Sequence, residues 1–216
     1  AFKMEEVRYY FGIIGIAILI IACNIYHIFG SAAKAFQQAA FQVGSIITTT
    51  GYATTDFNMW PEISRTILVI LMFIGACAGS TGGGMKVSRY IIYFKTLKKE
   101  LSTLIHPRSV KVIQCDGKAV DHDTIRSANI YLIAYIFIYM LSVLLISFDK
   151  FDLTTNFTAV AATFNNIGPG LNVVGPTGNF AGFSMFSKIV LIFDMLAGRL
   201  EIFPMLILLA PGTWKK

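Results

Sequence analysis

Charged side chains are scarce in this sequence. Only 14% of its 216 residues are Asp, Glu, Lys or Arg, whereas 55% are hydrophobic and the mean hydropathy is +0.65. A soluble domain of ordinary composition carries about 25% charged residues, and its helices have a polar face. Residues 11–22 contain no polar side chain at all. The composition therefore argues against a soluble helical protein and predicts a membrane protein.

Groups of metal-ligating or catalytic side chains are also lacking. Cys23, Cys77 and Cys115 have no metal-ligand spacing, and the three histidines are scattered along the chain. No nucleophile, base and orienting acid occur together at helical spacing. We therefore expect no enzyme, no resident cofactor and no metal-binding cluster.

Long apolar runs recur along the chain, and several approach the roughly 20 residues that a helix needs to cross a bilayer. No cleavable signal peptide is expected, because Glu5 and Glu6 flank the first run and no small-residue cleavage site follows it. We expect four crossings, at Tyr9–Phe29, about Glu62–Phe94, about Ile125–Phe148 and about Ser184–Ala210.

Positive charge is concentrated in one stretch between apolar runs and at both ends of the chain. The net charge is +6, and nine Lys or Arg residues lie between Lys86 and Arg126. The termini add Lys3, Arg8, Lys215 and Lys216. By the positive-inside rule, the termini and the central loop are expected in the cytoplasm. Lipid headgroups or a docked cytosolic protein account for the basic charge, so no nucleic-acid partner is expected.

A short segment lies between the two crossings of each half. Ala33–Ile47 and Leu153–Phe164 are too short to cross, and each ends in a turn sequence, TTTGY or NNIGPG. Non-helical backbone at membrane depth is tolerated only where protein buries it or where it lines a water-filled cavity. The pattern predicts an all-α membrane protein with two helix–pore-loop–helix repeats, residues 1–94 and 125–216, joined by a basic cytoplasmic loop, residues 95–124.

The two turn sequences are candidates for an ion-selectivity filter. Rings of backbone carbonyls can replace the water around a dehydrated potassium ion, and glycine accepts the torsions that turn carbonyls inward. The C-terminal end of each short helix would also point its partial negative charge at the cation. The alternative is a pair of simple turns, which Gly, Asn and Pro favour. The candidate filter residues are Thr49, Thr50, Gly51, Asn166, Ile167 and Gly168.

A glycine cluster interrupts the second expected crossing. Its spacing approaches that of a phosphate-binding loop, but Met85 stands where the lysine belongs and an apolar run precedes it, so we reject nucleotide binding. Isolated glycines can serve helix packing, whereas four within six positions should unwind the helix. The segment consists of Gly79, Ser80, Thr81, Gly82, Gly83 and Gly84.

Arg199 lies inside the fourth apolar run. An arginine at mid-membrane costs about 2.5 to 3.5 kcal/mol, so it should face a wet or paired interior. Gly168 follows Gly51 by 117 positions (168 − 51), and Arg199 follows Gly82 by the same number (199 − 82). This spacing predicts that Arg199 and the glycine cluster lie at one depth below the filter. The alternatives are pairing with Asp194 or Glu201, or snorkelling to the interface.

Four motifs together resemble the Trk/Ktr/HKT superfamily of potassium transporters. They are SIITTTGYATTDF, AGSTGGGMK, NNIGPGL and AGRLEIFP, and the resemblance to the third and fourth repeats of that superfamily covers essentially the whole chain. It implies potassium uptake through a channel-like pore in the bacterial inner membrane. It also implies that the glycine cluster and Arg199 form a gate beneath the filter.

The resemblance further implies a homodimer and a cytosolic nucleotide-binding regulatory subunit of the RCK type. Two pore loops cannot close a fourfold filter, so further repeats or a second copy must supply the rest. The Gly168–Gly170 loop departs from the plain potassium-channel pattern, which leaves the preference for potassium over sodium open. A sodium-coupled or weakly selective cation transporter is one alternative, and a non-conducting membrane assembly module is another.

Overall fold

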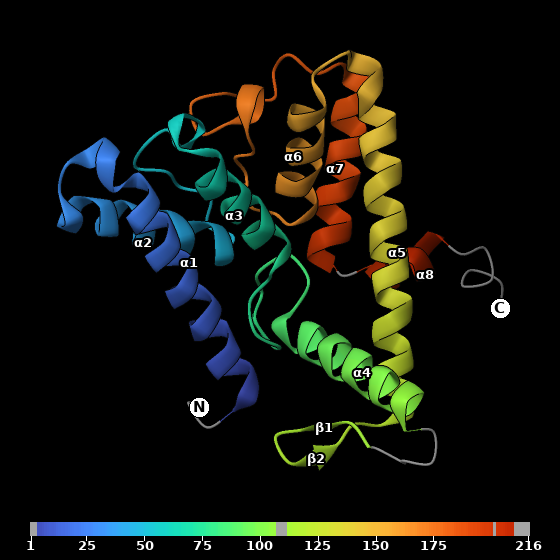
Figure 1. The fold of residues 1–216 in the computed structure, drawn as a ribbon. Helices are drawn as coiled ribbons and strands as arrows, with labels where there is room; N and C mark the ends of the chain where they lie inside the picture. Colours follow the sequence, from blue (N-terminus) through green and yellow to red (C-terminus); the bar gives the residue numbers. More distant parts are fainter. Residues whose placement is uncertain (1–3, 107–111, 201, 210–216) are drawn as a thin grey trace.

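The computed structural model describes residues 4–106, 112–200 and 202–209, and these are mostly helical (Figure 1). The helices are α1 (Glu5–Phe29), α2 (Ala32–Ile47), α3 (Glu62–Phe73), α4 (Val87–Ile105), α5 (His122–Ile146), α6 (Leu153–Phe164), α7 (Met185–Leu200) and α8 (Ile202–Leu209). Short 3-10 turns are η1 (Phe57–Met59), η2 (Ser147–Asp149) and η3 (Asn172–Val174). The all-α expectation misses one small hairpin, β1 (Gln114–Cys115) with β2 (Lys118–Ala119).

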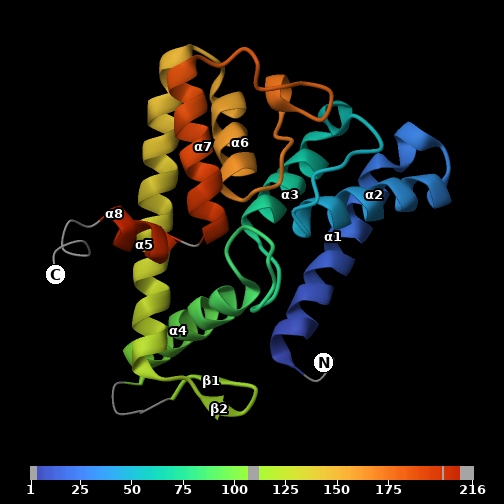
Figure 2. The same ribbon diagram turned by 180° about the vertical axis from the view of Figure 1, so that it is seen from behind.

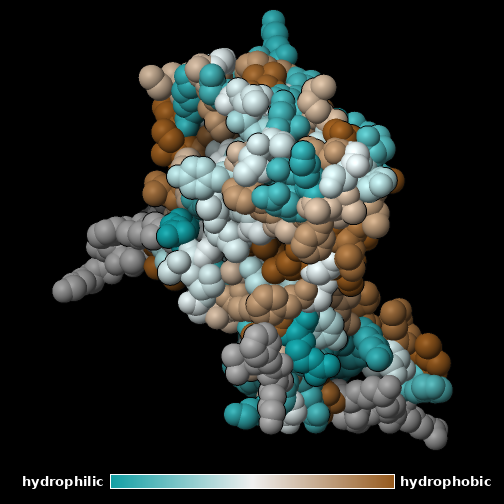
Figure 3. All heavy atoms as spheres, turned by 90° about the vertical axis from the view of Figure 1, so that its left-hand side faces the viewer, coloured by the Kyte–Doolittle hydropathy of each residue, from teal (hydrophilic) through white to brown (hydrophobic). Residues whose placement is uncertain are grey.

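Two helices in the described part of the chain are long and apolar enough to cross a membrane. They are α1 and the continuous helical stretch His122–Asp149, which joins α5 to η2. Both leave large apolar side chains uncovered, such as Ile16 at 62% and Ile133 at 69% exposure. Apolar surface on this scale needs lipid or further protein beside it. In Figure 3, hydrophobic residues run along both flanks between more hydrophilic ends.

The chain reverses direction after α1 through a glycine. Gly30 takes a left-handed conformation (φ 61°), and its amide donates to the Tyr26 carbonyl at 2.9 Å, which ends the helix. The short helix α2 then packs back along α1 (Figure 1). This helix and α6 occupy nearly the segments expected from the sequence, and both are too short to span a bilayer.

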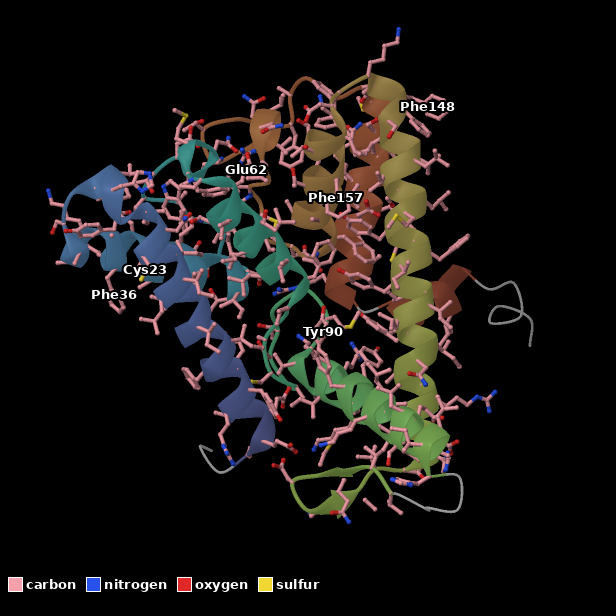
Figure 4. All side chains as sticks on the ribbon, in the orientation of Figure 1. Cys23, Phe36, Glu62, Tyr90, Phe148 and Phe157 are labelled. Carbon is pink, nitrogen blue, oxygen red and sulfur yellow. The ribbon has the colours of Figure 1, made fainter. Side chains whose placement is uncertain are left out.

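The second expected crossing is broken, as its glycines predicted. Helix α3 ends at Phe73, and residues 75–84 form a loop closed at its base by a bridge between Ile74 and Met85. Helix α4 then runs off to the side of α3, and the Tyr90 hydroxyl near its start donates to the Phe73 carbonyl at 3.0 Å (Figures 1 and 4). The segment expected as a loop from residue 95 begins as helix, because α4 continues to Ile105.

Two described helices, α7 and α8, lie within the fourth expected crossing. Helix α7 ends at Leu200 and α8 begins at Ile202, while residue 201 and residues from 210 onward lie outside the described part. Helix α7 stands beside α5 and α6, whereas α8 runs across α5 (Figures 1 and 2). The expected end of this crossing at Ala210 and the terminal residues Lys3, Lys215 and Lys216 fall outside the described residues.

An aromatic cluster joins the two halves of the chain. Phe73 of α3 lies 5.3 Å from Tyr139 of α5 and 6.0 Å from Phe157 of α6, measured between ring centroids. Phe164 packs edge-on against Tyr135 at 4.8 Å. Phe157, labelled in Figure 4, also lies 5.2 Å from Tyr139 of α5, so its ring contacts both neighbouring helices. Such pairs contribute roughly 0.5 to 1.5 kcal/mol each beyond their buried area, and they fix α6 against its neighbours.

Candidate functional site

The turn after α2 is held by a small set of backbone hydrogen bonds. The amides of Thr50 and Gly51 both donate to the Ser45 carbonyl, at 2.9 and 3.3 Å. Thr49 and Gly51 have positive φ angles of 55° and 78°. A left-handed backbone costs free energy at a residue with a side chain, such as Thr49. The hydrogen bonds and contacts around the turn must compensate for this cost.

The turn after α6 repeats this geometry. The amides of Ile167 and Gly168 both donate to the Ala162 carbonyl, at 2.8 and 3.4 Å, and Asn166 and Gly168 have positive φ angles of 55° and 115°. Ala162 follows its counterpart by 117 positions (162 − 45), and Gly168 by the same number (168 − 51). The two turns thus share a hydrogen-bond pattern and a pair of positive φ angles at a constant offset of 117 positions.

The two turns lie against each other. A β-carbon added at Gly51 would overlap the Ile167 carbonyl oxygen and come within 3.3 Å of Pro169 Cδ. Only glycine fits at this contact and this φ. The structure thus brings the two sets of candidate filter residues together, with the C-terminal ends of α2 and α6 leading into them.

The glycine segment lies next to both turns. The Gly83 amide is 3.4 Å from Thr49 Oγ1 of the first turn and donates to it. A β-carbon at Gly83 would overlap the Asn165 carbonyl oxygen at the start of the second turn. From both sides the segment is seen between α1 and the lower end of α7 (Figures 1 and 2). The segment is not helical, as its glycines predict, and its backbone lies directly beside the two turns with no bulky side chain between them.

Two positive side chains hold three consecutive carbonyls of this segment. Arg199 Nη1 donates to the Thr81 carbonyl at 2.6 Å. Lys86 Nζ donates to the carbonyls of Ser80 and Gly82, at 2.8 and 2.6 Å. The structure therefore brings Arg199 and the glycine segment together, in agreement with their repeat spacing. These oxygens are acceptors that a cation could otherwise use, and both donors are themselves cations.

The sequence left open a pairing of Arg199 with an acidic residue. Asp194 is fully buried and accepts a hydrogen bond at 2.7 Å from Ser142 of α5. Arg199 is exposed and its hydrogen bond goes to Thr81. The other candidate partner, Glu201, lies outside the described residues. Asp194 thus serves the contact between α7 and α5.

Sequence reasoning missed the residues that brace the second turn. The Tyr135 hydroxyl donates to Asn165 Oδ1 at 2.7 Å, and Asn166 Nδ2 donates to the Met195 carbonyl of α7 at 3.0 Å. Tyr131, Tyr135 and Tyr139 recur every four residues and are all buried. That spacing places the three tyrosines on one face of a helix. The sequence could therefore have predicted a buried face with hydroxyl groups on α5.

The chemical capacity of the site lies in its backbone oxygens. Among the described residues no group of three or more His, Cys, Asp and Glu side chains could hold a metal ion. The turns combine carbonyl groups, helix C-terminal ends and glycine at the contact points. Such groups suit a weakly held monovalent cation better than a resident divalent metal.

Comparison with known proteins agrees with these features. The TrkH family model, described as "Cation transport protein", matches residues 9–215. Trk system potassium uptake protein TrkH of Salmonella typhimurium is 38% identical over 92% of this chain and 41% of its own length. TrkH of Vibrio parahaemolyticus is 42% identical over 88% of this chain and 39% of its own. TrkG of Escherichia coli is 31% identical over 97% of this chain and 43% of its own.

The fold is similar to a solved structure. The crystal structure of the potassium transporter TrkH from Vibrio parahaemolyticus superimposes with a TM-score of 0.89 and 39% sequence identity, covering 99% of this chain and 46% of that one. The chain thus spans about two fifths of the length of the curated relatives named above.

Proposed function

The chain belongs to the TrkH family of cation transport proteins, and on that premise we propose that it forms part of a pore for potassium uptake across the bacterial inner membrane. Its relatives carry the name potassium uptake protein. The observation that carries the proposal is the duplicated turn, in which two short helices end in touching loops with the same hydrogen-bond pattern and positive φ angles at equivalent positions.

In this proposal the two turns form two walls of a selectivity filter. Residues 49–51 and 166–168 supply carbonyl oxygens to a dehydrated cation, and α2 and α6 direct their negative ends toward it. Each half of the chain is then a helix–pore-loop–helix repeat. The remaining walls come from two further repeats of the same kind or from a second copy of this chain.

The glycine segment and Arg199 form the proposed gate. A permeating cation leaving the filter meets the contact between Arg199 and Thr81, where a fixed positive charge opposes its passage. Two unit charges 4 Å apart repel by about 4 kcal/mol at an effective dielectric constant of 20. Flow therefore requires the segment and the guanidinium to move apart, and the inward membrane potential drives it.

The proposed assembly partners are membrane lipid, a second protomer and a cytosolic nucleotide-binding regulatory subunit of the RCK type. Helix α4 and the hairpin, which carry many of the described basic residues, lie at one end of the molecule, and this suits a cytoplasmic docking surface (Figure 1). The termini and this segment are placed in the cytoplasm by the positive-inside rule. The proposed function uses the transported ion and calls for no cofactor bound by the described residues.

Rubidium uptake into proteoliposomes that contain the full-length protein tests the filter. Gly51→Ser adds a β-carbon at a position with φ 78° where it would overlap Ile167, whereas Gly12→Ser adds one on α1 where no atom lies within 4 Å. We expect Gly51→Ser to lower the flux by about tenfold or more, because displaced backbone costs roughly 1 to 3 kcal/mol. Gly12→Ser should conduct like wild type.

Ion competition in the same assay separates the alternatives. Inhibition of rubidium uptake by potassium and not by sodium supports the potassium pore. Equal inhibition by both ions indicates a weakly selective transporter of the same architecture. Wild-type protein without flux, or Gly51→Ser with unchanged flux, contradicts the proposal and supports a membrane assembly module.

A further inference from the structure

One carboxylate of α1 accepts hydrogen bonds from residues on both sides of the glycine segment. Glu6 lies in the first turn of α1 and is only 8% exposed. Its Oε1 accepts hydrogen bonds from the Ala78 amide at 2.7 Å and from the Ser88 amide at 3.0 Å. Ala78 immediately precedes the glycine segment, and Ser88 lies in the first turn of α4. A single oxygen therefore joins both ends of the interrupted crossing.

Helix α4 lacks a cap of its own. Its N-cap residue, Lys86, makes no capping side-chain bond, and the first amides of any helix have no partner within it. Glu6 provides the missing acceptor from another helix, and its negative charge suits the positive end of the α4 dipole. Buried and bonded to two amides, this carboxylate is strongly held, since hydrogen bonds to charged groups are worth more than neutral ones.

We propose that Glu6 is a positioning residue that sets the resting position of the glycine segment. This inference rests on the proposed gate. Lys86 and Arg199 hold the carbonyls of Ser80, Thr81 and Gly82, while Glu6 holds the amide just before them. Without Glu6, the segment keeps its contacts with Arg199 and Lys86 and loses its tether to α1.

The neighbouring residue ties the same helix end to the hairpin. Glu5 forms an ion pair with Lys95 of α4 at 2.6 Å, and the Glu5 amide donates to Asp116 Oδ1 at 2.6 Å. Lys95 Nζ also donates to the Gln114 carbonyl at 2.7 Å. Displacement of the hairpin would therefore be transmitted to the end of α1 that carries Glu6, and through it to the segment.

The test compares three Glu6 variants of the full-length protein in proteoliposomes. Glu6→Leu removes the oxygen that accepts both hydrogen bonds, Glu6→Gln keeps a carbonyl oxygen at the same reach, and Glu6→Asp keeps the charge but is one methylene shorter. Glu100→Leu, at an exposed position of α4, is the matched control. We expect Glu6→Leu to raise the resting rubidium flux about fivefold or more, since losing one net hydrogen bond changes an equilibrium by roughly that factor.

Glu6→Gln should remain close to wild type, and Glu6→Asp should fall between the two. If Glu6 only stabilised the fold, Glu6→Leu would lower both the flux and the yield of purified protein and would not raise the flux. The ratio of potassium to sodium competition should stay unchanged in all three variants, because the filter is untouched. If Glu6→Leu does not fold, a raised flux in Glu6→Asp carries the inference. Unchanged flux in Glu6→Leu, or equal effects of Leu and Gln, overturns it.

A second readout does not depend on conduction. In a protein whose Cys23 and Cys115 are replaced by alanine, Cys77 next to Ala78 reports the segment through its rate of maleimide labelling. Glu6→Leu should raise this rate severalfold and Glu6→Gln should not. Loss of flux in Gly51→Ser together with unchanged Glu6→Leu flux and labelling contradicts the inference alone. Absent wild-type flux contradicts the proposed function, while the labelling rate still decides the role of Glu6.

Discussion

A single guanidinium group determines how the proposed gate opposes a cation. Arg199 is exposed at the end of α7, and its donation to the Thr81 carbonyl fixes the charge beside the glycine segment. The cost of placing arginine in an apolar run, about 2.5 to 3.5 kcal/mol on insertion scales, indicates that the position has a use. Repulsion of the permeating ion is the use that its contact suggests.

Arg199→Ala should therefore accelerate resting rubidium uptake by about tenfold or more, because the removed repulsion is worth a few kcal/mol. Arg199→Lys should stay nearer to wild type, since it keeps the charge. Lys188→Ala is the matched control, because Lys188 lies three turns earlier on α7 and its Nζ donates to the Ala181 carbonyl instead. Slower uptake in Arg199→Ala would contradict a barrier role.

Some site residues were predictable and others were not, for a physical reason. Arg199 stands out because a charge interrupts an apolar run, and Gly51 because a glycine follows a short helix. Lys86 and Glu6 lie at the ends of apolar segments, where charged residues are common because they face the membrane interface. Their sequence positions therefore do not distinguish them. Only the three-dimensional contacts between these side chains and the backbone of residues 78–82 assign them to the segment.

At the scale of elements, the short helix α6 depends on the cap at its N-terminal end. Asp152 Oδ2 accepts from the Thr155 amide at 3.0 Å and from Asn172 Nδ2 at 2.9 Å, and its Oδ1 accepts from the Thr155 hydroxyl. The Thr155 hydroxyl is the main cause that lowers the pKa of Asp152 below its usual value. The charged carboxylate is thus the form that caps α6.

Asp152→Ala should destabilise the protein by about 1 kcal/mol at neutral pH, the usual value of an N-cap. The pKa of Asp152 is lower in the folded protein than its unfolded value of about 3.9. The stabilisation by Asp152 is therefore complete above that unfolded pKa and is lost as the pH falls through the folded pKa. The difference in melting temperature in detergent should therefore shrink below about pH 4. Asp152→Asn should retain the cap, and a pH-independent deficit in Asp152→Ala would contradict this account.

Among the helices too, some were predictable from the sequence and others were not. Apolar length predicted α1 and α5, and short mixed-polarity segments predicted α2 and α6 close to their observed bounds. The direction of α4 was not predictable, because hydropathy records burial and not the angle at which a chain leaves an unwound segment. The extension of α4 to Ile105 was likewise hidden, since its basic residues are typical of a loop and of a surface helix alike.

At the scale of the whole molecule, charge is distributed unevenly between the two ends. Basic side chains gather with α4, the hairpin and the start of α5, namely Lys86, Arg89, Lys95, Lys98, Lys99, Lys118 and Arg126. The turn η1 lies at the opposite end, beside the start of α3 (Figures 1 and 2). Exposed apolar side chains of α1 and α5 lie between these ends, which matches a molecule embedded in lipid.

This asymmetry predicts the orientation of the protein, because clusters of Lys and Arg remain on the cytoplasmic side. In a variant without native cysteines, Met59→Cys replaces a side chain of η1 that is 79% exposed, and Lys98→Cys replaces an exposed one on α4. A membrane-impermeant maleimide should label Met59→Cys on intact spheroplasts and should label Lys98→Cys only after permeabilisation. The opposite labelling result would show that the protein has the opposite orientation. The proposed gate would then lie on the extracellular side of the filter, and a cytosolic regulator could not reach the basic end.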